Sequence, residues 1–210
     1  ITRFIKMPNI SYNRLLIKNL RFLIILTVFL SLISTSSLAQ KSRYIQYSSK
    51  GFVSGYSFIN EDMFDYSSYM PIHFIYRMNH PVFANPDAKF SNLFVHLEPQ
   101  VNLVLRGGKV HAYETGFNLE FTYNMQFTKR SIFYFGLGAG PHYISEGNIK
   151  LAQGFTFSDN FMSGVRTSFK EHKIELDIQL RFRHMSNAGL KDPTAGIDNW
   201  LLMIGISKLF

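Results

Sequence analysis

The chain lacks cysteine altogether among its 210 residues, which excludes disulfide bonds and thiolate metal sites. It also has little excess of positive charge once the N-terminal segment is set aside. The first 39 residues hold five basic residues and no acidic one, so the remainder has 17 basic and 14 acidic residues, a net charge of +3. So small an excess gives no support for a nucleic-acid partner, and we expect none.

Long apolar runs are scarce as well. The densest, from Phe22 to Ile33, is shorter than the about 20 residues that a transmembrane helix needs. Basic residues precede this run, and the small-x-small pattern Ser37-Leu38-Ala39 follows it. The segment 1–39 is therefore predicted to be a signal peptide that directs export and is cleaved between Ala39 and Gln40. Because the chain begins with Ile1, Met7 is the candidate start of translation.

Aromatic residues, by contrast, are abundant: 21 Phe and 11 Tyr, a content typical of a barrel with aromatic girdles. From Gln40 onward, several segments alternate between apolar and polar residues. The clearest is 113–127, where Phe117, Leu119 and Phe121 belong to one phase and Asn118 and Glu120 to the other. A period of two residues predicts a strand with one apolar and one polar face.

Eight such segments predict an all-β domain over residues 40–210, an eight-stranded antiparallel barrel. They are residues 46–59, 70–79, 91–105, 111–127, 131–145, 153–170, 173–186 and 197–210. A soluble lipocalin-like barrel keeps its apolar face inside, whereas a transmembrane barrel turns that face to lipid. The polar phases carry five charged residues that a dry core would not tolerate, namely Glu114, Glu120, Asp177, Arg181 and Arg183. This favours a transmembrane β-barrel of the bacterial outer membrane.

The two ends of the predicted barrel differ. An even number of strands puts both termini on the periplasmic side, and a terminal aromatic such as Phe210 resembles the sorting signature of outer-membrane barrels. The external connections are then predicted at Asn60–Tyr69, Ser145–Gln153 and Asn187–Ile197.

A candidate site lies at the outer end of the last two predicted strands. The apolar phase of 173–186 ends with His184 and Ser186, and the phase of the last strand that contains Phe210 also contains Asp198. Residues two apart on one strand face are roughly 7 Å apart, so an imidazole can reach a hydroxyl. A serine, a histidine base and an orienting carboxylate are the parts of an activated nucleophile. A His and a Ser at a strand end are also common as interfacial polar residues, and the spacing alone leaves both interpretations open.

The segment 182–190, together with Pro193, Gly196 and Asp198, resembles the lipid A 3-O-deacylase family. The resemblance implies an eight-stranded outer-membrane barrel that removes the ester-linked acyl chain at position 3 of lipid A. The His-x-Ser-Asn core of the family matches His184, Ser186 and Asn187, and Asp198 stands where the family more usually has Glu. The resemblance also implies an oxyanion site at Asn187 and the backbone amide of Gly189.

These observations lead to a hydrolase hypothesis in which Ser186 attacks the acyl carbonyl, His184 accepts its proton and Asp198 orients His184. No metal and no cofactor are implied, and the expected partners are lipid A, or lipopolysaccharide, and other outer-membrane lipids. The alternatives are a non-catalytic structural or adhesive barrel and an outer-membrane phospholipase or acyltransferase. The sequence leaves open whether the barrel acts as a monomer or as a homodimer.

Overall fold

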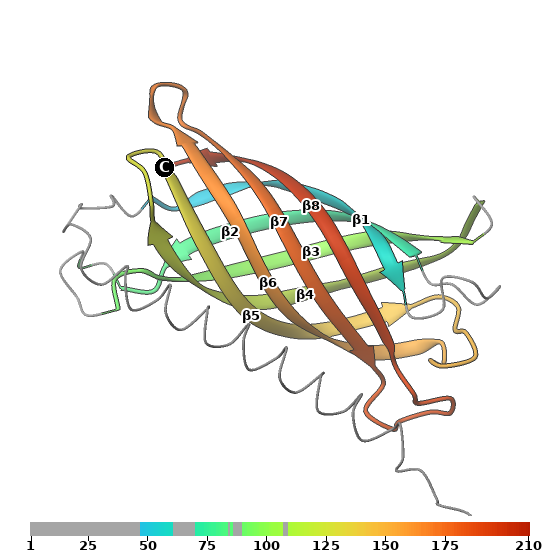
Figure 1. Cartoon of the computed structure of the whole chain (residues 1–210). Helices are drawn as coiled ribbons and strands as arrows, with labels where there is room; N and C mark the ends of the chain where they lie inside the picture. Colours follow the sequence, from blue (N-terminus) through green and yellow to red (C-terminus); the bar gives the residue numbers. More distant parts are fainter. Residues whose placement is uncertain (1–46, 61–69, 84, 86–89, 107–108) are drawn as a thin grey trace, which may run out of the picture. The chain divides into compact units, whose positions relative to one another are not determined.

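The computed structural model describes residues 47–60, 70–83, 85, 90–106 and 109–210, which form a closed antiparallel barrel (Figure 1). Its strands are β1 (Ser49–Asn60), β2 (Met70–Pro81), β3 (Leu93–Arg106), β4 (Lys109–Gln126), β5 (Ser131–Ile144), β6 (Gly154–Phe169), β7 (Ile174–Ser186) and β8 (Ile197–Leu209). Each pairs with its neighbours in the chain, and β1 pairs with β8 to close the barrel. The predicted eight-stranded barrel is confirmed, and the predicted strand ends differ from the observed ones by at most three residues.

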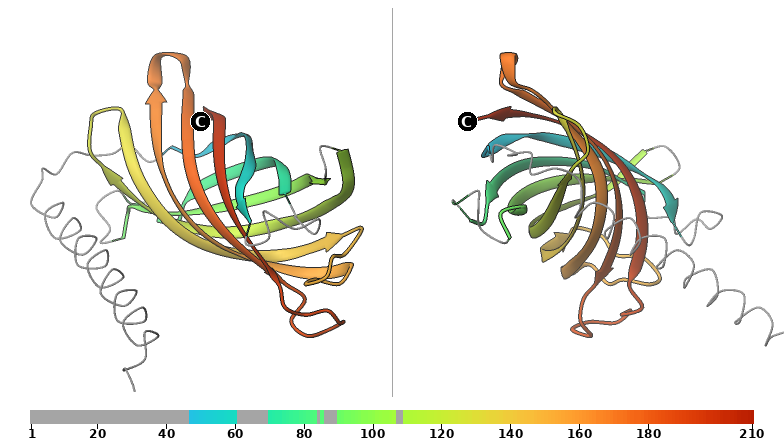
Figure 2. Two further views of the ribbon diagram at one scale, coloured as in Figure 1. Left: turned by 45° about the vertical axis from the view of Figure 1, so that its right-hand side comes forward. Right: turned by 60° about the vertical axis from the view of Figure 1, so that its left-hand side comes forward.

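The two ends of the barrel carry different connections (Figure 2). The C-terminus lies at the end that carries the β4–β5 turn and the β6–β7 turn, the latter a short 3₁₀ helix, η1 (Lys170–His172). The other end carries the β5–β6 and β7–β8 loops, and we call it the outer end because barrels of this kind have their longer loops outside the cell. The predicted signal peptide, residues 1–39, lies outside the described residues. Among the described residues, no helix is both long and apolar enough to cross a bilayer.

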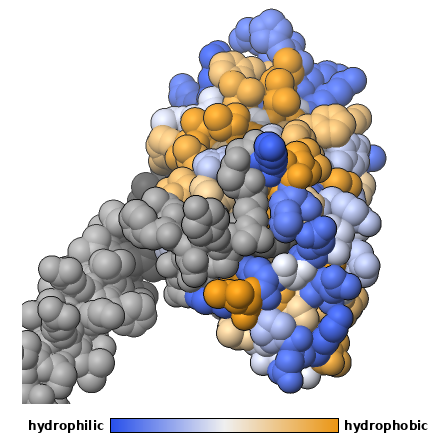
Figure 3. All heavy atoms as spheres, turned by 90° about the vertical axis from the view of Figure 1, so that its right-hand side faces the viewer, coloured by the Kyte–Doolittle hydropathy of each residue, from blue (hydrophilic) through white to orange (hydrophobic). Residues whose placement is uncertain are grey.

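The outward face of the barrel is apolar. Phe161, Ile178 and Ile204 have about 60% of their surface exposed, although such side chains are usually buried in soluble proteins. Figure 3 shows hydrophobic side chains gathered in the upper part of one view, with hydrophilic side chains above and below them. An apolar outer surface of this kind is the surface that a membrane barrel presents to lipid.

Much of the interior is polar, and its charges are paired. Arg77 on β2 contacts Glu98 on β3 (Nε to Oε1, 2.5 Å) and also binds Asp177 on β7. Arg181 on β7 contacts Glu98 (2.8 Å) and Glu120 on β4 (3.0 Å). Because each carboxylate here meets at least one guanidinium, the barrel can enclose charges that would be costly if buried alone. The predicted lumen face is confirmed: all five charged residues named from the sequence are at most 4% exposed.

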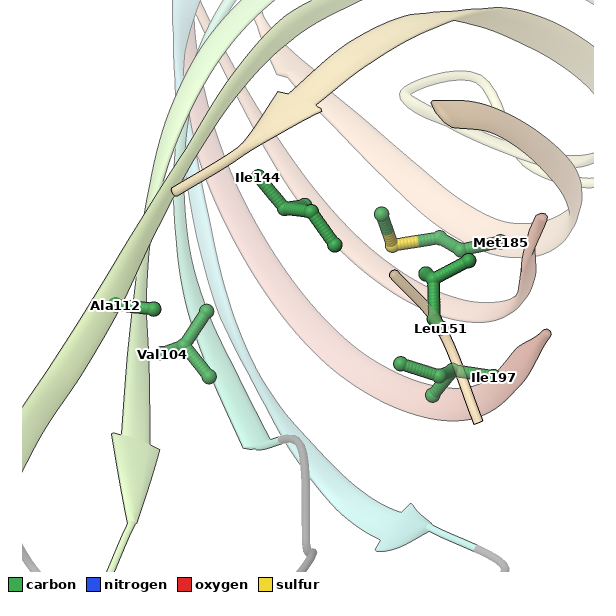
Figure 4. Close-up of a cluster of buried hydrophobic side chains, with 6 residues drawn as sticks. All are labelled: Val104, Ala112, Ile144, Leu151, Met185 and Ile197. Carbon is green, nitrogen blue, oxygen red and sulfur yellow. The ribbon is translucent and has the colours of Figure 1, made fainter. Parts of the chain in front are cut away.

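Near the outer end, apolar side chains replace this polar network inside the barrel (Figure 4). The cluster consists of Val104, Ala112, Ile144, Leu151, Met185 and Ile197. Most of its members come from strands, but Leu151 comes from the β5–β6 loop and is fully buried. The loop therefore folds back into the mouth of the barrel.

The assignment of faces can be tested at the middle of β7. Leu180→Arg places a charge on the outward face, and a charge near the bilayer midplane costs about 2–4 kcal/mol. We expect a correspondingly lower unfolding free energy in lipid vesicles, measured by urea titration. Leu190→Arg, the same change at an exposed loop residue beyond β7, is the matched control and should have little effect on stability. Equal stability of the two variants would mean that the outward face of β7 does not meet lipid.

The interior network makes a second prediction. Arg77→Met leaves Glu98 and Asp177 with fewer partners at a fully buried position, and breaking a buried ion pair costs about 3–5 kcal/mol. The control is Arg130→Met, because Arg130 is exposed and lies 3.6 Å from Glu171, and such pairs contribute less than about 1 kcal/mol. Urea unfolding of both variants would compare them directly. A stable Arg77 variant would contradict the interpretation of the lumen as a mutually dependent ion-pair network.

Candidate active site

The outward face of β7 changes from apolar to polar at its outer end. Leu180 and Phe182 belong to this face, and the next two positions in the same phase are His184 and Ser186. Between them, Arg183 and Met185 point into the barrel and are completely buried. The alternation that makes β7 a membrane strand thus carries two reactive side chains to the outside of the barrel, as the sequence predicted.

A carboxylate from the neighbouring strand meets the histidine. His184 and Asp198 are register partners across β7 and β8, and His184 Nδ1 lies 2.6 Å from Asp198 Oδ1. Because an ionised carboxylate only accepts hydrogen bonds, Nδ1 is the donor, which leaves Nε2 of a neutral imidazole as the proton acceptor. The two side chains are 38% and 30% exposed, so the pair is accessible from outside the barrel. The predicted pairing of His184 with Asp198 is therefore observed.

Ser186 is the last residue of β7 and follows His184 on the same face. Across β6 its register partner is Phe157. In the described structure no hydrogen bond joins Ser186 to His184, although the spacing of roughly 7 Å between alternate residues of one face leaves both side chains within reach. Such contacts are often long in enzymes without substrate and shorten in the complex.

The predicted oxyanion donors take part in the structure of the loop that follows. The side chain of Asn187 is buried; its Nδ2 donates to the carbonyls of Lys191 and Pro193, the latter at 3.3 Å. Its Oδ1 accepts from the amide of Gly189 at 3.2 Å. In this arrangement Asn187 and Gly189 order the loop, and neither donor points to a free position.

A tight turn begins at the same asparagine. Leu190 N donates to Asn187 O at 3.0 Å, and the two central residues, Ala188 and Gly189, have positive φ angles of 51° and 77°. Positive φ at both central positions is the conformation of a type I′ turn. Glycine adopts it without strain, whereas alanine does so at a cost of about 1 kcal/mol. The chain thus reverses immediately after the candidate nucleophile.

Two neighbours of His184 were not found by the reasoning from sequence. Asp159 on β6 is its register partner on the side opposite Asp198, and it is exposed. It is the one charged residue in the phase of β6 that contains Phe157 and Phe161, and this was the signal that could have identified it. Gly196 is the other neighbour: a Cβ built on it would lie 2.9 Å from Cε1 of His184. No spacing rule indicates that contact, because it depends on the path of the loop.

Aromatic side chains border the site on the outer surface. Phe157, beside Ser186, stacks edge to face against Phe155 with 5.0 Å between the ring centroids. Phe182 and Trp200, the register pair next to His184 and Asp198 along the barrel, have centroids 5.3 Å apart. A cluster of polar side chains bordered by aromatic rings is suited to an amphipathic molecule with an apolar chain.

A group of residues that could act as metal ligands lies inside the barrel. Ligand atoms of His96, Glu98 and Glu120 lie within 4.8 Å of one another, because β3 and β4 pair His96 with Glu120. Both carboxylates, however, already bind Arg181, and Glu98 also binds Arg77. Because guanidinium groups already neutralise these carboxylates, the group belongs to the ion-pair network of the lumen.

Comparisons with known proteins identify the family and the fold. The profile of the family described as lipid A 3-O-deacylase (PagL) matches residues 72–207. Among curated proteins, none matches the chain significantly. The crystal structure of the outer membrane enzyme PagL is similar with a TM-score of 0.52 at 16% identity, over 75% of this chain and 97% of that chain. Neisserial surface protein A (NspA) has a TM-score of 0.51 at 10% identity, over 79% of this chain and 96% of that chain.

At such identities the likeness to solved structures shows the fold alone: that of an outer-membrane β-barrel. The family match is more specific, because the matched range runs from β2 into β8 and includes His184, Ser186 and Asp198. It covers well over half of the chain. This chain therefore belongs to the lipid A 3-O-deacylase (PagL) family.

Proposed function

We propose that this chain is an outer-membrane serine esterase that hydrolyses the acyl chain ester-linked at position 3 of lipid A. The observation that supports it most directly is the 2.6 Å contact between His184 Nδ1 and Asp198 Oδ1, on the outward face and two residues from Ser186. Family membership supports the substrate class.

The location of the three side chains suits this substrate. Lipid A occupies the outer leaflet, so its ester bonds lie at the outer boundary of the apolar layer. His184 and Ser186 lie at the outer end of β7, above the exposed apolar residues of the same face. A lipid beside the barrel can therefore present its ester to Ser186 while its acyl chains remain against the aromatic rings of Phe182 and Trp200. No entry into the lumen is needed.

In the first half of the reaction, Ser186 Oγ attacks the acyl carbonyl and His184 Nε2 accepts the hydroxyl proton. Asp198 holds the Nδ1–H and stabilises the imidazolium that forms. The tetrahedral intermediate then breaks its bond to the sugar oxygen, which takes the proton from Nε2 and leaves as the free 3-hydroxyl. The acyl group remains on Ser186 as an ester.

In the second half, water attacks this acyl ester. His184 Nε2 accepts a proton from the water, and the acyl–Oγ bond breaks as that proton returns to Ser186. The products are a free fatty acid and the regenerated enzyme. The outward and partly exposed position of His184 allows water to reach the acyl carbon from the loop side of the barrel.

Stabilisation of the negatively charged oxygen in each intermediate is proposed for Asn187 and the amide of Gly189. Both donors are engaged within the loop in the present arrangement. The proposal therefore includes an exchange in which Asn187 Nδ2 leaves a loop carbonyl, that of Lys191 or Pro193, for the oxyanion when substrate binds.

The serine mechanism predicts that Ser186→Ala and His184→Ala keep the folded barrel but lower kcat by about 10³-fold or more. The assay is release of the 3-O-linked hydroxyacyl chain from lipid A by the folded protein in detergent, measured by mass spectrometry. Ser163→Ala, an outward-facing serine of β6 distant from the site, is the control and should retain full activity.

Three outcomes of this assay would contradict the proposal in different ways. A fully active Ser186→Ala variant would reject the serine mechanism. A wild-type protein that cleaves phospholipids but not lipid A would instead indicate a phospholipase. A wild-type protein that releases no fatty acid from either lipid would favour a non-catalytic barrel.

The role of Asp198 gives a separate prediction, because Asp159 offers a matched carboxylate on the other side of His184. Asp198→Asn should lower kcat by roughly 10²-fold, less than loss of the serine, since it removes the charge that orients His184 but leaves the base and the nucleophile in place. Asp198→Glu should retain substantial activity. Asp159→Asn should leave kcat close to wild type, because Nδ1 of His184 is bound to Asp198 and not to the Asp159 side chain. If the two Asn variants lose equal activity, Asp198 is not the specific orienting group.

A further inference from the structure

Two outer loops pair with each other beside the candidate site. Leu151 of the β5–β6 loop forms an antiparallel bridge with Thr194 of the β7–β8 loop. Ala152 N donates to Pro193 O at 3.0 Å, and Gly196 N donates to Lys150 O at 3.2 Å. Residues 150–152 thus pair with residues 193–196, the segment that leads into Asp198.

The segment 148–152 is anchored at two points. Leu151 is fully buried in the apolar cluster at the mouth of the barrel, together with Met185 and Ile197 (Figure 4). These two residues are the inward-facing neighbours of His184 and Asp198 in the chain, so Leu151 packs directly behind the catalytic pair. Asn148 fixes the bend before it: its Oδ1 accepts from Lys150 N at 2.9 Å and from Leu151 N at 2.8 Å.

The paired loop brings Gly196 against the imidazole. A Cβ on Gly196 would lie 2.9 Å from Cε1 and 3.3 Å from Nε2 of His184, and the φ of Gly196 is +79°. A glycine is thus needed here both for its backbone conformation and for the space. The backbone of Gly196 consequently borders the edge of the ring that carries Nε2, the atom that must accept the proton of Ser186.

We propose that Asn148–Ala152 is a positioning segment of the active site: through Leu151 and the carbonyl of Lys150 it holds Gly196 against His184 and so fixes the direction of Nε2. The proposal rests on the proposed esterase function for its catalytic consequence. The segment touches no reacting atom, and its effect is exerted through Gly196 and the orientation of the His184 ring.

The kinetic test uses two variants of the segment, each with a conservative partner. Leu151→Ala removes the buried anchor and Leu151→Met restores most of its volume; Asn148→Ala removes the two bonds of the bend and Asn148→Asp keeps an acceptor oxygen. We expect both Ala variants to lower kcat about tenfold with unchanged KM for lipid A, and both conservative variants to recover. Gln153→Ala, an exposed residue next to the segment, is the matched control.

A second readout does not depend on activity. In wild-type protein labelled with ¹⁵N-histidine, His184 should show one protonated and one unprotonated ring nitrogen, assigned by its loss in His184→Ala. In the two Ala variants these signals should shift toward each other as the ring becomes mobile. Gel mobility of unheated samples establishes that the barrel is folded. If Leu151→Ala fails to fold, Asn148→Ala still tests the proposal, because it changes only the loop.

The outcomes separate this proposal from the proposed function. Wild-type kcat and unchanged His184 signals in both Ala variants would overturn the positioning role. A raised KM with unchanged kcat would also overturn it, because the segment would then bind substrate. If wild type hydrolyses no lipid, while the Ala variants still alter the His184 signals, the esterase proposal fails and the positioning of His184 stands.

Discussion

The structure depends on the two-residue period of strands that have lipid on one side and an enclosed lumen on the other. Lipid offers no hydrogen-bond partner, so charged side chains in the middle of the strands turn inward, where they form ion pairs. Arg77, Glu98 and Arg181 meet this requirement by joining β2, β3 and β7 across the interior. The apolar residues of the alternate phase on the same strands then cover the outside.

The same constraint explains the position of the candidate site. On β7 the outward phase is apolar until His184, and on β8 its partner Asp198 interrupts the outward phase at the same level. Polar groups on a lipid-facing surface are costly unless they lie at the rim and bind one another, as this pair does at 2.6 Å. An enzyme that acts on a lipid of the outer leaflet needs its reactive groups at this boundary. The position at the rim therefore explains both how the barrel tolerates these polar groups and how they would reach a lipid substrate.

The two faces of the barrel and the positions of His184 and Asp198 were predictable from the sequence because strand phase is a local property. The alternation of 113–127 fixed which residues face the lumen, and the phases of Phe182 and Phe210 brought His184 and Asp198 to one face. Loop structure is not local in this sense. The bonds of Asn187 within its own turn and the pairing of Leu151 with Thr194 depend on how two loops meet, so no periodicity indicates them. Asp159 was visible in principle as a charge in an apolar phase.

The central claim is that Ser186 is a nucleophile activated by His184. Its most direct test is covalent trapping in lipid vesicles by a long-chain alkylphosphonate ester with a nitrophenol leaving group, which reacts with an activated serine without needing turnover. The account predicts one adduct per folded wild-type chain, mapped by peptide mass spectrometry to Ser186, and little or none in His184→Ala. An adduct on another residue, or equal labelling of the His184→Ala variant, would contradict it.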